Sequence, residues 1–342
     1  MVSKSTVLVV GAGGSAPFGF PSGRGLVELV LEDIALAGNP RGTPIDRIQT
    51  FRSVSNFEAI LRQDPELFGK MKQFGEGLRR SASNSLDAFV ERRREFLAEC
   101  KLAIASTLIP CEKENALFFA RGQEGAKDTG DWYRYLVNCL YDNLGRGHKE
   151  SLTILTYNYD RSLEHYLHTA LANALGLDEK KEHEELSQLS FIHLHGSLGK
   201  LPWQAKSDDD SSRGYDARCD IEIAKKAAEQ IKIIHENEDE TPEYTLALKR
   251  LNQAERIGFL GFGYHRTNVR RLLKTRWVDG ATPFGGKLIH GSSCGLTDSE
   301  RIECEKRFGI FGTQRTQNEV GRIGPMSLCA SDMIAWDSCA IT

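Results

Sequence analysis

The sequence predicts an α/β fold: a Rossmann-like parallel sheet with helices on both faces and a large inserted helical module. Short runs of β-branched and aliphatic residues recur along the chain, and each ends in a glycine or a polar side chain. The first run leads directly into a glycine-rich turn, and a long block of helical periodicity separates it from the second. A chain of 342 residues, 40% of them hydrophobic, can bury the core of such a fold.

Five runs are expected to form buried strands. They are Thr6–Val10, Leu152–Thr156, Leu189–Leu194, Ile257–Leu260 and Lys287–His290. Ligands of open parallel sheets bind outside the carboxyl ends of the strands. We therefore expect the functional residues to follow these runs.

The block between the first two strands is expected to be an inserted helical module. Its predicted bounds are residues 25–150, and the core is expected to comprise residues 1–24 and 151–342. The block is too long for an ordinary crossover. Glu32 and Asp33 fall in LVELVLEDIALAG, which has the pattern of a helix.

Other helices are indicated by caps and by apolar spacing. Ser55 and Glu58 form a capping-box pattern, and helical spacing runs from Leu86 to Ile104 and again from Trp132 to Leu140. Thr241-Pro242 indicates the start of a later helix, and the polar residues 206–214 indicate an exposed loop.

Charge and cysteine content limit the possible partners. The 44 basic and 47 acidic residues give a net charge of -3, so we expect neither direct nucleic-acid binding nor membrane binding. The first apolar run is interrupted by glycines, and no run reaches the ~20 residues of a membrane span, so a cytoplasmic location is expected. The eight cysteines form no C-x-x-C pair, so we expect no zinc.

The glycine-rich turn fits a dinucleotide-binding pattern. Gly11-Ala12-Gly13-Gly14-Ser15-Ala16 is a G-x-G-x-x-A sequence directly after a strand, where backbone N–H groups can reach a pyrophosphate. A structural turn without a ligand stays open as an alternative. A dehydrogenase would place an acidic residue at the end of the next strand, but Glu32 and Asp33 lie in a helical pattern. Another use of the nucleotide is therefore favoured.

Three ordered segments resemble the sirtuin family. GAGGSAPFGFPSGR resembles the sirtuin opening, with Gly19, Pro21 and Arg24 at the family's intervals. TYNYD, which contains Tyr157, Asn158 and Asp160, resembles the T-Q-N-x-D block, and His195-Gly196 resembles the catalytic histidine-glycine pair. A fourth segment, Gly261-Phe262-Gly263-Tyr264, follows a strand where sirtuins have another nucleotide-binding loop.

The resemblance implies that NAD is the substrate, with Asn158 and His195 as the catalytic residues. It also implies a nucleotide-binding set: Gly11, Ala12, Gly13, Ser15, Gly19, Pro21, Arg24, Tyr157, Asp160, Gly261 and Gly263. The zinc C-x-x-C pairs of protein deacetylases are missing, and Ser22 and Gly23 replace their aspartate and phenylalanine. The chain is thus similar to bacterial sirtuin-like NAD hydrolases of antiphage defence, which release nicotinamide and ADP-ribose.

The chemistry of these residue types suits that reaction. The nicotinamide of NAD is a cationic leaving group, so the site must support an oxocarbenium-like ribose and place a water. The Asn158 amide can orient water and a ribose hydroxyl, and Asp160 can bind the nicotinamide carboxamide. The His195 imidazole can accept a proton near neutral pH.

Other assignments stay open at this point. His193 and His195 are two apart on a strand, so with Asp160 they could form part of the site of a metal-dependent hydrolase. A non-catalytic sensor of NAD or ADP-ribose that regulates a partner is a second alternative. Arg24 could instead pair with an acid on the surface, and His265 and the Gly291-Ser292-Ser293 turn are weaker site candidates.

Free NAD hydrolysis would kill the cell unless it were controlled. We therefore expect control by homo-oligomerisation, by the helical module, or by a separately encoded partner such as a ring-shaped ATPase or translocase.

Overall fold

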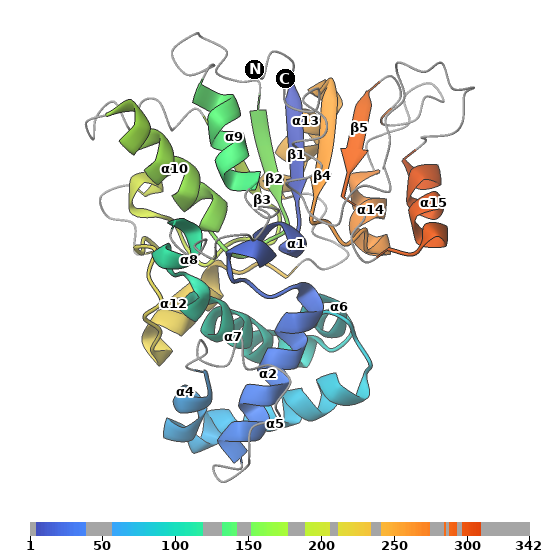
Figure 1. Ribbon diagram of the computed structural model, residues 1–342. Helices are drawn as coiled ribbons and strands as arrows, with labels where there is room; N and C mark the ends of the chain where they lie inside the picture. The colour runs from blue at the N-terminus through green and yellow to red at the C-terminus, as the bar shows by residue number, and fades with distance from the viewer. Residues whose placement is uncertain are drawn as a thin grey trace, which may run out of the picture.

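Five parallel strands form one sheet in the computed structural model, in the order β3-β2-β1-β4-β5 (Figure 1). The strands are β1 (Thr6–Val10), β2 (Leu152–Thr156), β3 (Ser190–His193), β4 (Arg256–Leu260) and β5 (Leu288–Gly291). The structure describes residues 5–38, 57–118, 132–141, 152–176, 189–205, 211–233, 241–273, 284, 287–292 and 296–308. The predicted Rossmann-like α/β fold is confirmed.

Both faces of the sheet are covered, which explains why its strands are apolar throughout. All five residues of β1 and all five of β2 are buried. Leu8 and Val10 pack into one apolar cluster, whereas Val7 and Val9 pack into a second cluster on the opposite face. This is the period-two alternation of a strand between two helical layers.

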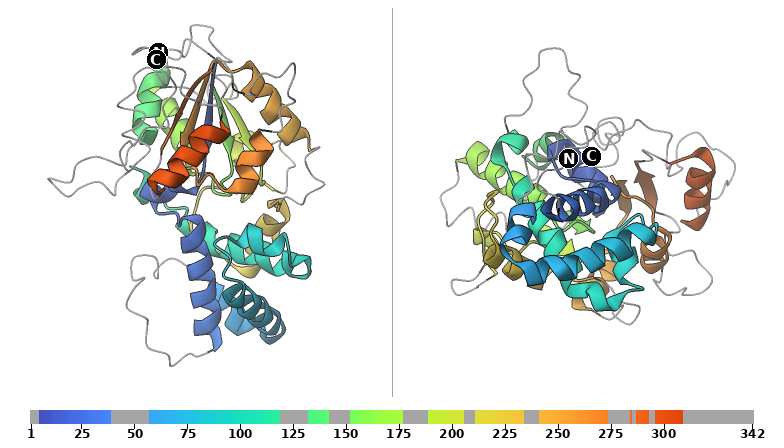
Figure 2. Two further views of the ribbon diagram at one scale, coloured as in Figure 1. Left: turned by 90° about the vertical axis from the view of Figure 1, so that its right-hand side faces the viewer. Right: turned by 90° about the horizontal axis from the view of Figure 1, so that it is seen from below.

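Helices from different parts of the chain cover the two faces. Figure 2 (left) shows the sheet nearly edge-on between them. The face of Leu8 packs against α9 (Trp132–Tyr141) and α10 (Ser162–Leu175). The other face packs against α13 (Pro242–Gln253), α14 (Arg266–Leu272) and α15 (Asp298–Arg307). The predicted start of α13 is confirmed, because the Thr241 hydroxyl accepts a hydrogen bond from Tyr244 N.

Six further helices among the described residues form a second lobe beyond the carboxyl ends of the strands (Figure 1). This helical lobe consists of α2 (Gly23–Gly38), α4 (Phe57–Gln63), α5 (Pro65–Arg80), α6 (Leu86–Val90), α7 (Leu97–Leu108) and α12 (Ile221–Gln230). Its apolar residues belong to the same cluster as Leu8 and Val10. The lobe and one face of the sheet thus share a continuous core.

Short elements complete the described chain. Two of them are the short α-helices α1 (Ala12–Ser15) and α8 (Glu114–Phe118). The others are the 3-10 turns η1 (Ala16–Phe18), η2 (Arg94–Phe96), η3 (Ile109–Cys111) and η4 (Pro202–Gln204). No helix in the described ranges is both long and apolar enough to cross a membrane.

The helical block departs from the predicted pattern in three places. The expected run from Leu86 to Ile104 is broken, because α6 ends at Val90 and the 3-10 turn η2 precedes α7. Within the predicted module of residues 25–150, α9 lies beside α10 on the sheet, and α12 from outside that range packs on α7. Ser55 of the predicted capping box lies outside the described residues.

Candidate functional site

The glycine-rich turn packs directly against the loop after β4. Gly11 N donates to Leu260 O at 3.0 Å, and Gly13 N donates to Gly261 O at 3.0 Å. A Cβ on Gly11 would lie 2.7 Å from Gly261 O, and a Cβ on Gly261 would lie 1.9 Å from Gly14 N. The two backbones therefore touch where the direction of strand order changes, between β1 and β4, which is the usual ligand crevice of this fold.

This packing gives the glycines a structural reason that does not depend on a ligand. Gly14 N donates to Gly11 O at 2.8 Å, so the amides of Gly13 and Gly14 are both bonded within the protein. Gly261 has a φ of 58°, a backbone conformation that glycine adopts without strain. The alternative of a structural turn thus has direct geometric support.

Asn158 lies in a buried hydrogen-bond network with the first turn. Its Nδ2 donates to Gly11 O at 3.1 Å and to Ser15 Oγ at 3.0 Å. Its backbone N donates to Thr156 Oγ1, which fixes the chain as it leaves β2. Among the described residues, none donates a hydrogen bond to Asn158 Oδ1, so this oxygen is left for water or a ligand.

Asp160 extends the same network. Its Oδ2 accepts from Ser15 Oγ at 2.8 Å, and its Oδ1 accepts from Ser162 N at 3.1 Å and from the Ser162 hydroxyl. Burial raises the pKa of the Asp160 carboxyl, although these donors oppose the shift. β2 ends at Thr156, so Asp160 lies beyond the strand, and Ser15 Oγ links its carboxylate to the Asn158 carboxamide.

A small cavity adjoins Asn158 and Asp160. Its volume of about 10 Å³ corresponds to roughly one water molecule. It is lined by Val10, Tyr133, Ile154, Thr156, Asn158, Asp160, Leu163, Glu164 and Phe191. The polar groups among them give a bound water hydrogen-bond partners beside the carboxamide.

His193 and His195 have different partners, although the sequence placed both on one strand face. β3 ends at His193, so His195 follows in a turn. His193 Nδ1 lies 3.1 Å from Asn158 O, and its Nε2 hydrogen-bonds to Glu164 of α10. Burial opposes the charged form of His193, but Glu164 and the Asn158 carbonyl prevail and raise its pKa. In the described part of the chain, no three potential metal ligands lie together.

His195 is buried beside the residues that flank Asn158. Its ring centroid lies 5.2 Å from that of Tyr157, edge to face, and 5.9 Å from that of Tyr159. Its Nδ1 lies 3.9 Å from Asp87 Oδ1 of α6, and its Nε2 is buried without a hydrogen-bond partner among the described residues. Burial lowers the pKa of His195, so the imidazole is neutral at pH 7.

Several other predicted site residues lie apart from this network. The Arg24 side chain is 79% exposed and pairs with Glu28 at 3.0 Å, as in the surface alternative. Gly19 ends η1 with a φ of 89°, Pro21 is buried before α2, and a Cβ on Gly263 would meet open space. Ala12, by contrast, contacts the network: it opens α1, and its carbonyl oxygen accepts a 3.4 Å hydrogen bond from Ser15 Oγ.

The weaker candidates have mixed positions. His265 is exposed and precedes α14 without a side-chain cap. Ser292 is buried and accepts a 2.8 Å hydrogen bond from Gly261 N, so it supports the loop after β4. Ser293 lies outside the described residues.

The sequence reasoning did not identify three residues that hold the site. Trp132 Nε1 donates to Gly14 O at 2.8 Å and so fixes the first turn from α9. Arg161, next to Asp160, forms a buried two-point ion pair with Glu112. Asp87 reaches His195 from the helical lobe. Each contact joins residues far apart in the chain, so local sequence patterns carry no signal for it.

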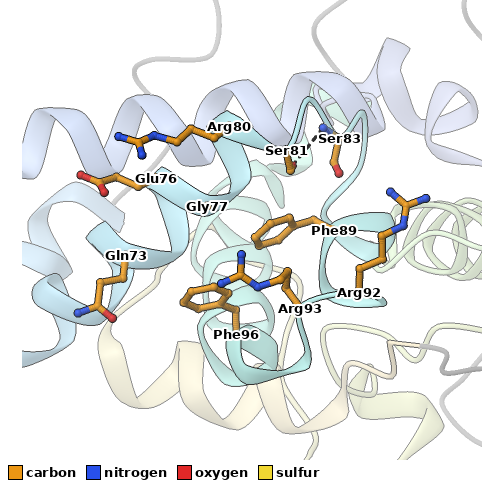
Figure 3. A pocket seen from close by; sticks show the side chains of 10 residues that line it. All are labelled: Gln73, Glu76, Gly77, Arg80, Ser81, Ser83, Phe89, Arg92, Arg93 and Phe96. Atoms are coloured by element: carbon orange, nitrogen blue, oxygen red, sulfur yellow. Dashed lines mark hydrogen bonds between the residues drawn. The ribbon is translucent and has the colours of Figure 1, made fainter.

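A wide concavity of about 640 Å³ lies on the helical lobe, away from this network (Figure 3). Its basic residues Arg80, Arg92 and Arg93 lie at or just after the carboxyl ends of α5 and α6. Cations are favourable there because the last carbonyl groups of a helix carry partial negative charge. Figure 3 shows the Arg80 and Arg92 side chains pointing away from each other, and Arg93 lies 5.0 Å from the Phe96 ring centroid. We assign this basic lining a structural role.

Comparison with known proteins leaves the family of this chain open. No model of a known protein family matches the chain, and no curated protein matches it significantly.

Proposed function

We propose that this protein hydrolyses the bond between nicotinamide and ribose in NAD, giving nicotinamide and ADP-ribose. One observation carries the proposal: the first turn and the segment after β2 share a buried network of Ser15, Asn158 and Asp160. His195, after β3, lies against both residues that flank Asn158. The three segments that resemble sirtuin motifs thus converge at the carboxyl ends of three adjacent strands.

Asn158 would orient the reacting groups. Its Nδ2 is held by Gly11 O and Ser15 Oγ, so the carboxamide is fixed and its Oδ1 is free to accept from a water or a ribose hydroxyl. Because the Asn158 carboxamide dipole is already oriented, it can stabilise the positive charge that develops on the ribose without first having to reorient.

His195 would take the proton. Its buried neutral imidazole leaves a nitrogen lone pair available at neutral pH. Water adds to the anomeric carbon of the ribose as the C–N bond breaks, and neutral nicotinamide leaves with the bonding electron pair. The proton lost by the water passes to the base, so the reaction yields nicotinamide, ADP-ribose and one proton.

The resemblance to antiphage enzymes extends the proposal to the cell. We infer that the protein depletes cytoplasmic NAD during phage infection, as an abortive-infection defence. Its activity would be held in check by homo-oligomerisation or by a partner such as a ring-shaped ATPase or translocase.

The test measures nicotinamide and ADP-ribose release by the purified full chain, together with NAD levels in phage-infected cells that express it. Asn158→Ala and His195→Ala should each lower release by about 100-fold or more. Asn173→Ala, on the exposed part of α10, and His168→Ala serve as matched controls and should retain activity.

Three results would contradict the proposal. Unchanged NAD both in vitro and during infection would exclude the hydrolase. NAD binding without turnover, unaffected in both variants, would instead support the sensor alternative. Activity that disappears on chelation and returns with zinc or manganese would support the alternative of a metal-dependent hydrolase using His193 and His195.

A further inference from the structure

We infer that Asp87, a residue of the helical lobe, is a positioning residue for His195 and that Tyr159 holds its carboxylate in place. This inference rests on the proposed function for its catalytic meaning. The contact itself is a structural feature that can be tested without any substrate.

The geometry places one carboxylate between two site residues. Asp87 Oδ1 lies 3.9 Å from His195 Nδ1 and accepts a hydrogen bond from the Tyr159 hydroxyl. Tyr159 and His195 are buried, with rings 5.9 Å apart, whereas the Asp87 side chain is 34% exposed. Catalytic hydrogen bonds are often long in a ligand-free site and shorten when the substrate binds. A small movement of α6 would bring Asp87 to hydrogen-bond distance from the imidazole.

The consequence for His195 is a choice of tautomer. A carboxylate beside Nδ1 favours the proton on that nitrogen, which leaves the lone pair on Nε2. Nε2 is the atom that is buried without a partner among the described residues. The arrangement therefore presents an unoccupied acceptor to a ligand, and it stabilises the imidazolium that forms when a proton is accepted.

Charged groups approach His195 from two sides. Asp87, on α6, favours the protonated imidazole, whereas burial and Arg271, on α14, favour the neutral one. Burial, Asp87 and Cys100 of α7 all raise the pKa of Tyr159, so its hydroxyl stays protonated and donates to Asp87. Asp87 is the acid that the helical lobe contributes to this balance.

The experiment compares Asp87→Asn and Tyr159→Phe with Glu91→Gln, which removes a carboxylate one turn further along the chain. The first readout is the NMR titration of the His195 ring in the full-length protein. Asp87→Asn should lower the pKa of His195, because it removes the acid that favours the charged form, and Glu91→Gln should not change it. An unchanged His195 titration in Asp87→Asn would overturn the inference.

The second readout is nicotinamide release. Asp87→Asn should lower kcat by about 10-fold to 100-fold with KM nearly constant, and should move the acid limb of the pH profile to lower pH. A purely structural contact would lower the thermal stability and leave the acid limb in place, which would also contradict the inference. If Asp87→Asn does not fold, Tyr159→Phe replaces it. This variant removes the hydroxyl that holds the Asp87 carboxylate beside His195, so the pKa of His195 and kcat should both fall.

The two proposals fail in different ways. If the wild type releases no nicotinamide but Asp87→Asn still shifts the His195 titration, the proposed function is wrong and the positioning contact stands. If the wild type releases nicotinamide but Asp87→Asn leaves the His195 titration unchanged, the proposed function stands and the positioning contact is wrong.

Discussion

Gly261 shows how one residue can hold two loops together. Its φ of 58° and its contact with the backbone of Gly13 and Gly14 leave no room for a side chain. Gly263, two residues later, has open space around its missing Cβ. The same loop therefore contains one glycine that the packing requires and one that it does not.

Gly261→Ala should accordingly destabilise the protein by at least about 2 kcal/mol, since it combines left-handed backbone strain with overpacking. Gly263→Ala is the matched control and should change the free energy of unfolding by less than about 1 kcal/mol. Denaturant titration of both variants measures the difference. Equal stability of the two would show that the loops separate readily.

The sequence predicted the site only where local patterns carry the signal. Asn158 and Ser15 stand in recognisable segments after strands, and the fold brings them together because parallel strands end at one edge. Arg24 stands at the sirtuin interval in the sequence, but its side chain is exposed and pairs with Glu28 four residues on. Such a pair forms on any helix surface and carries no signal for nucleotide binding. Asp87 could not be found, because nothing in the sequence pairs α6 with the turn after β3.

At the scale of elements, His193 and Glu164 join the end of β3 to the first turn of α10. The folded pKa of His193 is raised above its ordinary value, mainly through Glu164 acting against burial. A raised histidine pKa contributes stability below the unfolded value of about 6.5, and this contribution is lost as the pH rises through the folded pKa.

His193→Gln should therefore cost most stability below about pH 6.5, and the difference from the wild type should shrink as the pH rises. His168 is a control of opposite sign, because burial lowers its pKa to about 4. His168→Gln should relieve a penalty that grows as the pH falls below about 6.5. Thermal unfolding of the variants between about pH 4 and about pH 9 checks both trends, because this interval includes the lowered pKa of His168 and extends above the ordinary histidine value of about 6.5. A difference for His193→Gln that is independent of pH would contradict the assignment.

The strands were predictable because burial on both faces leaves a continuous apolar run in the sequence. β1 and β2 match their predicted bounds to the residue, and β3 is shorter by one residue at each end. The break between α6 and α7 was not predictable from spacing alone. The apolar positions keep a helical period across it, while Ser85 caps α6 and Arg93 leaves the helical conformation.

At the scale of the molecule, a buried ion pair links the segment that follows α7 and η3 to the start of α10. Arg161 donates to Glu112 at 2.9 and 2.7 Å, with 1% and 0% of the two side chains exposed. Arg161 also donates to the carbonyls of Lys200, Arg213 and Gly214. The loop expected at residues 206–214 is therefore anchored at its end, since the Arg213 side chain also pairs with Glu112.

Glu112→Gln should lower the free energy of unfolding by about 3–5 kcal/mol, because it leaves buried arginine charge without its counterion. Glu114→Gln is the control: Glu114 pairs with His165 while 58% exposed, and its loss should cost less than about 1 kcal/mol. Equilibrium denaturation of both variants gives the comparison. A cost below about 1 kcal/mol for Glu112→Gln would mean that water reaches the arginines.

The packing of α7 against α12 has a consequence for folding during synthesis on the ribosome, because α7 is made well before α12. α7 is buried on all sides from Leu102 to Leu108, and its partner α12 begins only at Ile221, after β2 and β3 have been made. At a synthesis rate of about 5–20 residues per second, roughly 6–23 seconds pass between the synthesis of Leu108 and that of Ile221. During that interval the apolar side chains of α7 that α12 will cover stay exposed, and transiently exposed surface of this kind is prone to aggregation.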